Sequence, residues 1–221
     1  MKLRLTLIGL ILIYFGYYTY AQSVADTDGN VYPIVQIGKQ VWMAENLKTT
    51  KLNDGKPIPM VKDFKAWIAL STPAYCWLRN DIGNKEEFGA LYNFYTVNTK
   101  KLCPAGWHVP SKDDWFGLEL FLGNKDQAGG KLKEAGLEHW KNANFETTND
   151  YGFTALPAGG RRPDFDFPST DGVYSIWWSS TEASKDKAWN RGLFIYTNLF
   201  YGSNDYKILG CSVRCIKDQP K

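Results

Sequence analysis

The chain has few of the side chains that most often hold metal ions or attack substrates. Its 221 residues include 2 His, 4 Cys and 3 Met. Its cysteines form no C-x-x-C pair, whereas zinc sites usually combine Cys and His ligands at close spacing. The sequence therefore predicts no metal site, and it gives no reason to expect a cofactor.

Signatures of the common enzyme classes are lacking as well. No G-x-S-x-G elbow, H-E-x-x-H pair or G-x-x-x-x-G-K-[ST] phosphate loop occurs. Asp113 and Asp114 are adjacent, and adjacent helix positions point apart, so they do not form a catalytic pair of carboxylates. We therefore expect no catalytic residues. The chain also has no run of five basic residues, and its formal net charge is only +3, which argues against nucleic acid as a partner.

The one long apolar stretch lies at the N-terminus. Lys2 and Arg4 precede an uncharged, mostly apolar run over residues 5–20, and Thr19-Tyr20-Ala21 has the small-x-small pattern of a cleavage site. We predict a signal peptide over residues 1–21 and an extracytoplasmic location, with no stable membrane span after cleavage. A retained anchor is the alternative, although a spanning helix needs about 20 apolar residues. The remaining chain has the length of one domain, expected over residues 26–218.

An exported chain can keep disulfides. The four cysteines, Cys76, Cys103, Cys211 and Cys215, allow three complete pairings. Cys211 and Cys215 would lie about 13 Å apart on one strand, so we do not expect a bond between them. Spacing alone leaves the other pairings open.

Helical spacing is confined to the first part of the chain. The short run 62–70 is loosely helical, and Phe88, Leu91, Tyr92 and Tyr95 fall at i, i+3, i+4 and i+7, which predicts a helix over 88–97. A second main helix is expected over 112–122, because Ser111 and Asp114 form a capped helix start.

Strand-like runs precede and follow these helices. Residues 31–37 and 40–43 flank Gly38-Lys39, a pattern typical of a tight β-hairpin. Later strands are expected over 152–158, 174–180, 189–197 and 208–217. The expected fold class is α+β, with two main helices in the first half and an antiparallel sheet with long loops in the second.

Several distinctive blocks of sequence follow one another along the chain: DGNVY at 28–32, IGKQVWMAENL at 37–47, GALYN at 89–93, LCPAGWHVP at 102–110, GFTALPAG at 152–159, WSST at 178–181 and SVRC at 212–215. Taken in this order, they resemble the Fibrobacter succinogenes major paralogous domain family. The resemblance covers nearly all of the chain that follows the expected signal peptide.

This resemblance implies a C-type-lectin-like fold, which formylglycine-generating (sulfatase-modifying) enzymes share. The shared marks are Pro110-Ser111 with Trp115, and Gly210 with Arg214-Cys215. The motif positions imply a disulfide between Cys103 and Cys215, while Cys76 and Cys211 could pair or stay free. The family setting implies an extracytoplasmic protein with a glycan or a surface protein as partner.

Two functions remain open at this point. One is a non-enzymatic binding or adhesion module of the cell envelope or exterior. The other is a degenerate or altered relative of the formylglycine-generating enzymes, which hold copper with a Cys pair just before the closing strand. Residues 182–210 contain no Cys, so we favour the binding module.

Aromatic residues and arginines gather with Gly, Ser and Asp over residues 161–206, a composition suited to carbohydrate or protein recognition. Neighbouring residues of a strand face opposite sides, so we expect either Trp177 or Trp178 to face solvent or lie beneath a loop. The alternative is that these aromatics fill the core. The predicted ligand-binding residues are Arg161, Arg162, Phe165, Trp177, Trp178 and Tyr201.

Overall fold

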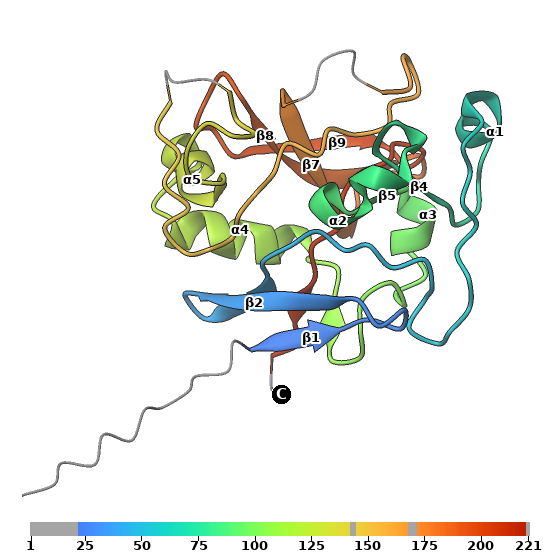
Figure 1. Ribbon diagram of the computed structural model, residues 1–221, viewed down its shortest axis with the longest axis horizontal. Helices are drawn as coiled ribbons and strands as arrows, with labels where there is room; N and C mark the ends of the chain where they lie inside the picture. The colour runs from blue at the N-terminus through green and yellow to red at the C-terminus, as the bar shows by residue number, and fades with distance from the viewer. Residues whose placement is uncertain (1–21, 142–144, 168–171, 220–221) are drawn as a thin grey trace, which may run out of the picture.

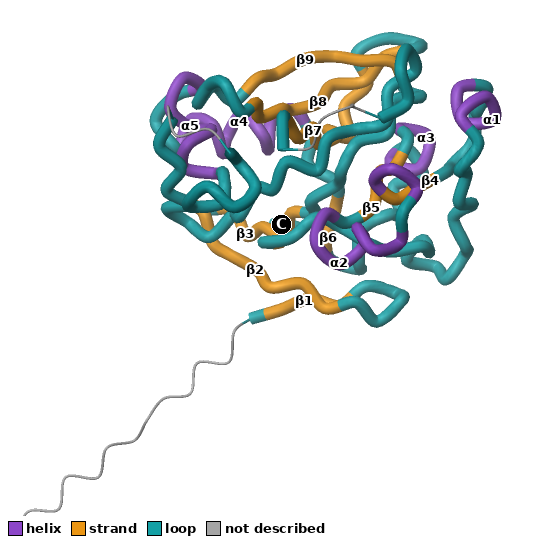
Figure 2. Tube along the Cα trace, turned by 45° about the horizontal axis from the view of Figure 1, so that its top comes forward, coloured by secondary structure: helices purple, strands orange, loops and turns teal. Residues whose placement is uncertain are grey.

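The computed structural model describes residues 22–141, 145–167 and 172–219 as three antiparallel sheets joined by short helices and long loops (Figures 1 and 2). This agrees with the α+β class expected from the sequence. The predicted signal peptide over residues 1–21 lies outside the described residues. Within the described ranges, no helix has both the length and the apolar character needed to span a bilayer.

The largest sheet brings together the beginning and the end of the described chain. Its strand order is β1-β2-β3-β10-β6. The strands are β1 (Ser23–Ala25), β2 (Val31–Ile37), β3 (Gln40–Met43), β6 (Trp107–His108) and β10 (Ile216–Lys217). The predicted hairpin is confirmed, because β2 and β3 pair with Ile37 opposite Gln40 and Gly38 turns the chain at a φ of +60°.

The predicted helix over 88–97 is wrong. Gly89 has a φ of +73°, and a Cβ atom there would come within 2.8 Å of the Asn46 side chain. The helical turn before Gly89 therefore stops, and the chain continues as β5, which pairs with β4. This region consists of α1 (Phe64–Ile68), β4 (Tyr75–Trp77), 3₁₀ turns Leu78–Asn80 and Ile82–Asn84, α2 (Lys85–Phe88), β5 (Ala90–Tyr92) and α3 (Phe94–Val97).

The second main helix is confirmed as α4 (Lys112–Phe121). Ser111 caps it, and the Asp114 carboxylate accepts in return from the Ser111 backbone N–H, which completes a capping box. Trp115 is buried between the Trp42 ring of β3, 4.7 Å away, and the Phe200 ring, 5.8 Å away. α4 therefore packs between the hairpin and the C-terminal sheet, next to α5 (Lys125–Leu132) (Figure 1).

The C-terminal sheet has the order β7-β8-β9. Its strands are β7 (Tyr174–Glu182), β8 (Lys187–Phe194) and β9 (Tyr201–Tyr206). The strand expected over 152–158 is absent from the described structure, where Ala155 makes one isolated bridge to Lys133. Over 208–217 regular pairing is limited to β10, and the residues before it make isolated bridges.

The predicted disulfide between Cys103 and Cys215 is confirmed. It ties the segment that enters β6 to the residue that precedes β10. Cys76 and Cys211 are buried free thiols, and burial raises the pKa of Cys76 to about 12. Neither thiol is therefore set up as a nucleophile at neutral pH.

A buried hydrogen-bond network around Asn46 joins distant parts of the chain. The Asn46 Oδ1 atom accepts from Trp177 Nε1 at 2.8 Å and from Arg214 Nη2 at 2.9 Å. Arg214 is 1 % exposed and also donates to the Phe153 carbonyl, and its guanidinium lies over the Phe153 ring. Asn46, Phe153 and Arg214 all lie in the blocks that carry the family resemblance, so these blocks build the interior.

Candidate binding site on the C-terminal sheet

The C-terminal sheet has a cavity on each of its two faces. Side chains alternate along β8, so Asn190, Gly192 and Phe194 face one way while Trp189 and Arg191 face the other. We call the first face, directed away from α4, the outer face. Its cavity has a volume of ≈ 570 Å³ and is lined by Arg162, Ile176, Asn190, Gly192, Phe194, Tyr196, Thr197, Tyr201, Ser203 and Asp205.

A row of aromatic rings crosses the outer face from strand to strand. Tyr174 of β7 stacks on Phe194 of β8 at 5.9 Å between centroids, and Tyr201 of β9 meets Phe194 edge-on at 5.2 Å. Gly192 lies opposite Tyr201 in the register, and a Cβ atom at Gly192 would come within 3.3 Å of the Phe194 ring, so Gly192 makes room for that ring beside Tyr201. Burial raises the pKa of Tyr174 to about 12, which keeps its hydroxyl protonated. The Tyr174 ring at one end of the row is buried, and the Tyr201 ring at the other end is exposed.

Polar groups border these rings. Asn190 Nδ2 donates to the Asp205 Oδ2 atom at 2.9 Å, which fixes an amide and a carboxylate side by side at one end of the cavity. Ser203 lies between Tyr201 and Asp205 on the same strand face. Arg162 lines the cavity from the neighbouring loop, where its guanidinium also pairs with Asp164. The cavity thus offers apolar ring surface together with hydrogen-bond donors and acceptors.

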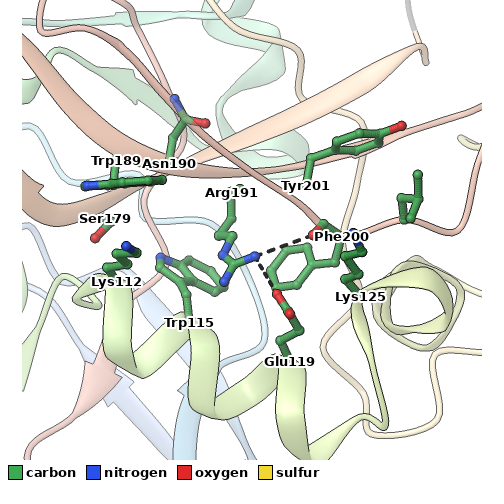
Figure 3. Close-up of a pocket in the computed structure, with 12 residues that line it drawn as sticks. Lys112, Trp115, Glu119, Lys125, Ser179, Trp189, Asn190, Arg191, Phe200 and Tyr201 are labelled. Carbon is green, nitrogen blue, oxygen red and sulfur yellow. Dashed lines mark hydrogen bonds and ion pairs between the residues drawn. The ribbon is translucent and has the colours of Figure 1, made fainter. Parts of the chain in front are cut away.

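The second cavity, of ≈ 350 Å³, lies between the other face of the sheet and helix α4 (Figure 3). We call it the inner cavity. Arg191 points into it from β8 and pairs with Glu119 of α4 at 2.5 Å, while its guanidinium lies over the Phe200 ring. Lys112 Nζ lies 4.0 Å from the centre of the Trp189 ring. Cations of the protein itself therefore cover the aromatic surface of the inner cavity.

The two cavities differ in which side chains are free to contact a ligand. In the inner cavity, Arg191 and Glu119 neutralise each other and Lys112 lies on Trp189. In the outer cavity, Tyr196 is 68 % exposed and Tyr201, which also borders the inner cavity, is 42 % exposed. The outer cavity is therefore the better candidate site, because its aromatic rings can stack with a ligand without displacing an ion pair.

A comparison with models of protein families decides which family the chain belongs to. The model of the Fibrobacter succinogenes major domain matches residues 35–217, which is most of the chain. The chain belongs to the Fibrobacter succinogenes major domain family. The assignment made from the sequence blocks is thus confirmed. No curated protein and no solved structure matches the chain.

The two tryptophans predicted to bind ligand lie inside this Fibrobacter succinogenes major domain. Trp177 and Trp178 are both 0 % exposed. Their side chains do face opposite sides of β7, but each side has a core of its own. Trp177 packs on Phe153 and donates to Asn46, whereas Trp178 packs on Phe94 and donates to the Tyr92 carbonyl. Neither ring is therefore accessible to a ligand in this structure.

Arg161 is also a structural residue of the domain. It is 0 % exposed and lies between the rings of Trp67 and Phe167. Its guanidinium donates to the carbonyls of Val61 and Lys62 at 2.7 Å each, and to Asp166. These bonds hold the segment before α1 against the 161–166 turn, so Arg161 is not available to a ligand.

The other three predicted residues are accessible. Phe165 is 50 % exposed, and the Arg162 guanidinium lies over its ring. Arg162 and Tyr201 line the outer cavity. The residues that sequence reasoning missed are Asn190, Phe194, Tyr196, Ser203 and Asp205. Alternation along β9 would have placed Tyr201, Ser203 and Asp205 on one face, but the Gly, Ser, Asn and Asp of this strand are typical of loops.

Proposed function

We propose that this Fibrobacter succinogenes major domain is an exported, non-enzymatic binding module that takes a glycan in its outer cavity. The observation that carries the proposal is the exposed end of the aromatic row, with Tyr201 at its edge and the Asn190–Asp205 pair beside it. A pyranose ring has an apolar face that packs on an aromatic ring, and its hydroxyls both donate and accept hydrogen bonds.

The chemistry of the cavity favours a neutral sugar. Asp205 and Asn190 offer oxygens for sugar hydroxyls, while Arg162 offers N–H groups at another part of the lining. The lining holds one carboxylate, Asp205, which accepts from the Asn190 amide, and one guanidinium, Arg162, which pairs with Asp164, so the charged side chains of the lining are of both signs. A net charge on the ligand is therefore not needed for it to be bound.

We also propose that the domain has a C-type-lectin-like fold. A C-type-lectin-like fold rests on the motif resemblance, including the capped helix start at Ser111 and the closing Arg214-Cys215 pair. Binding through loops and one sheet face suits that fold. Fold alone does not fix function, so the proposal depends on the site.

The binding proposal is tested by screening the protein that starts at Gln22 on a glycan array and titrating each glycan that binds. Tyr201→Ala should weaken binding at least tenfold, because it removes a stacking ring, and about 1.4 kcal/mol corresponds to tenfold in affinity. The matched control is Tyr206→Ala. Tyr206 is 56 % exposed on the same strand, but it faces the other side of the sheet and lies near Lys187.

Tyr206→Ala should bind as the unchanged protein does. Full retention of binding by Tyr201→Ala, with loss in Arg191→Ala, would move the site to the inner cavity. An array on which no glycan binds would overturn the choice of ligand.

Export is tested separately. We expect the full chain, expressed with its own N-terminus in a bacterium, to yield an extracytoplasmic product that begins at Gln22, because the sequence around Ala21 fits signal-peptidase cleavage. N-terminal sequencing gives the answer. A membrane-bound product that keeps Met1 would contradict cleavage and favour a retained anchor.

A further inference from the structure

Helix α2 and the segment after α5 bring three glutamates to the ring of His139. The His139 Nδ1 atom lies 2.6 Å from Glu134 Oε2, and the Nε2 atom contacts Glu87. Ligand atoms of Glu134, Glu138 and His139 all lie within 4.8 Å of one another. Residues 134–139 and residue 87 are far apart in the sequence, so no spacing rule would have found this group.

Each ring nitrogen of His139 faces a carboxylate, Glu134 at Nδ1 and Glu87 at Nε2. A neutral imidazole carries one N–H. If Nε2 donates to Glu87, the lone pair of Nδ1 faces the Glu134 carboxylate, and two acceptors meet with no hydrogen between them. A proton or a metal ion on Nδ1 removes the conflict. A proton makes His139 an imidazolium bonded on both sides, and a metal ion would take the place of that proton.

The surrounding structure holds these groups in place. Lys133 donates from Nζ to the carbonyls of Phe194 and Thr197 at 2.8 and 2.7 Å, and Trp140 donates to the Ala155 carbonyl at 2.7 Å. Both ends of the 133–140 segment are thereby fixed. The His139 ring also meets Phe88 edge-on at 6.0 Å. Fixed ligands of this kind lower the entropy lost when an ion binds.

The group opens into a cavity of ≈ 360 Å³. Glu138 and His139 line this cavity together with Asp81 and Asn84. Glu138 is exposed, so its carboxylate can rotate toward an ion at small cost. A tetrahedral zinc ion holds its ligand atoms about 3.3 Å apart, which needs only a small opening of the His139–Glu134 contact and an inward turn of Glu138.

We propose that Glu134, Glu138 and His139 bind a divalent transition-metal ion of the zinc type, and that Glu87 orients the imidazole. The imidazole ligand favours zinc over calcium or magnesium, which take oxygen ligands. Carboxylates that accept from the second nitrogen of a metal-binding His are a common support, and Glu87 has this position. Three protein ligands leave a fourth position for water or for a donor atom of a ligand in the cavity.

The test uses the protein that starts at Gln22, first treated with a chelator and then titrated with ZnCl₂ by calorimetry at neutral pH. We expect one ion per chain at micromolar or tighter affinity, and at least tenfold weaker binding in Glu138→Gln. Because Glu138 is exposed, this variant should keep the melting temperature of the metal-free protein. Glu87→Ala should weaken binding, and Glu87→Gln, which keeps an acceptor oxygen, should restore it.

His108→Ala is the matched control. His108, the only other His, also lies between two carboxylates, Asp218 at 2.5 Å and Asp114 at 3.3 Å. Its loss should leave zinc binding unchanged. The absence of zinc binding in the unchanged protein would overturn the proposal and favour the proton. Unchanged affinity in both Glu138→Gln and His139→Ala would overturn it as well.

Discussion

Replacing Asn46 with Leu is expected to destabilise the fold by about 3–5 kcal/mol, the range measured when a buried charge loses its partner. Leu has nearly the shape of Asn but no acceptor oxygen. The Arg214 guanidinium would lose two hydrogen bonds, and Trp177 Nε1 would lose its acceptor. Both donors are fully buried, and a buried donor without a partner costs about 1–3 kcal/mol.

Denaturant titration followed by tryptophan fluorescence measures this effect. Asn98→Leu is the control, because Asn98 is exposed at the end of α3 and adopts helical backbone angles. It should change the free energy of unfolding by less than about 0.5 kcal/mol. The double variant Asn46→Leu/Arg214→Leu should lose less stability than the sum of the two single variants, because it removes the buried charge together with its acceptor. Strict additivity of the two effects would show that Asn46 and Arg214 do not stabilise the fold through each other.

Loss of the Cys103–Cys215 disulfide is expected to destabilise the protein by about 4–5 kcal/mol in the chain-entropy model. The two cysteines are 112 positions apart, so the bond closes a long loop and strongly limits the unfolded chain. Cys103→Ala/Cys215→Ala and reduction of the unchanged protein should shift the unfolding midpoint to lower denaturant by similar amounts.

Cys211→Ala separates loss of the bond from loss of a buried sulfur. Cys211 is a free thiol in the same hydrophobic cluster as Cys103 and Cys215. This variant should cost only about 1 kcal/mol, the scale of a small cavity. A double variant as stable as Cys211→Ala would contradict the role given to the disulfide.

Local chemistry was enough to predict the hairpin and helix α4. Gly38 between two β-rich runs, and Ser111 with Asp114 before an apolar run, act within a few residues of the chain. The helix expected over 88–97 failed for a long-range reason. Gly89 packs against Asn46, and Tyr92 exchanges backbone hydrogen bonds with Cys211. Helical spacing of apolar residues cannot reveal such partners.

The candidate site was predicted only in part. The sequence of a strand does not show which distant residues cover each of its faces. Alternation placed Trp177 and Trp178 on opposite sides of β7 correctly, but it could not show that Phe153 covers one side and Phe94 the other. Arginine usually lies at the surface, yet Arg161 is buried, where it donates to the backbone carbonyls of Val61 and Lys62. Tyr201 and Arg162, two of the residues predicted to bind ligand, line the outer cavity.

NMR mapping would show whether the outer face of the C-terminal sheet binds a glycan, as we propose. Isotope-labelled protein starting at Gln22 would be titrated with the glycan that binds best on the array. The largest amide shifts should fall in β8 and β9 around Asn190, Phe194 and Tyr201, and near Arg162. Shifts centred on α4 and Arg191, on His139, or on no part of the chain would contradict the claim.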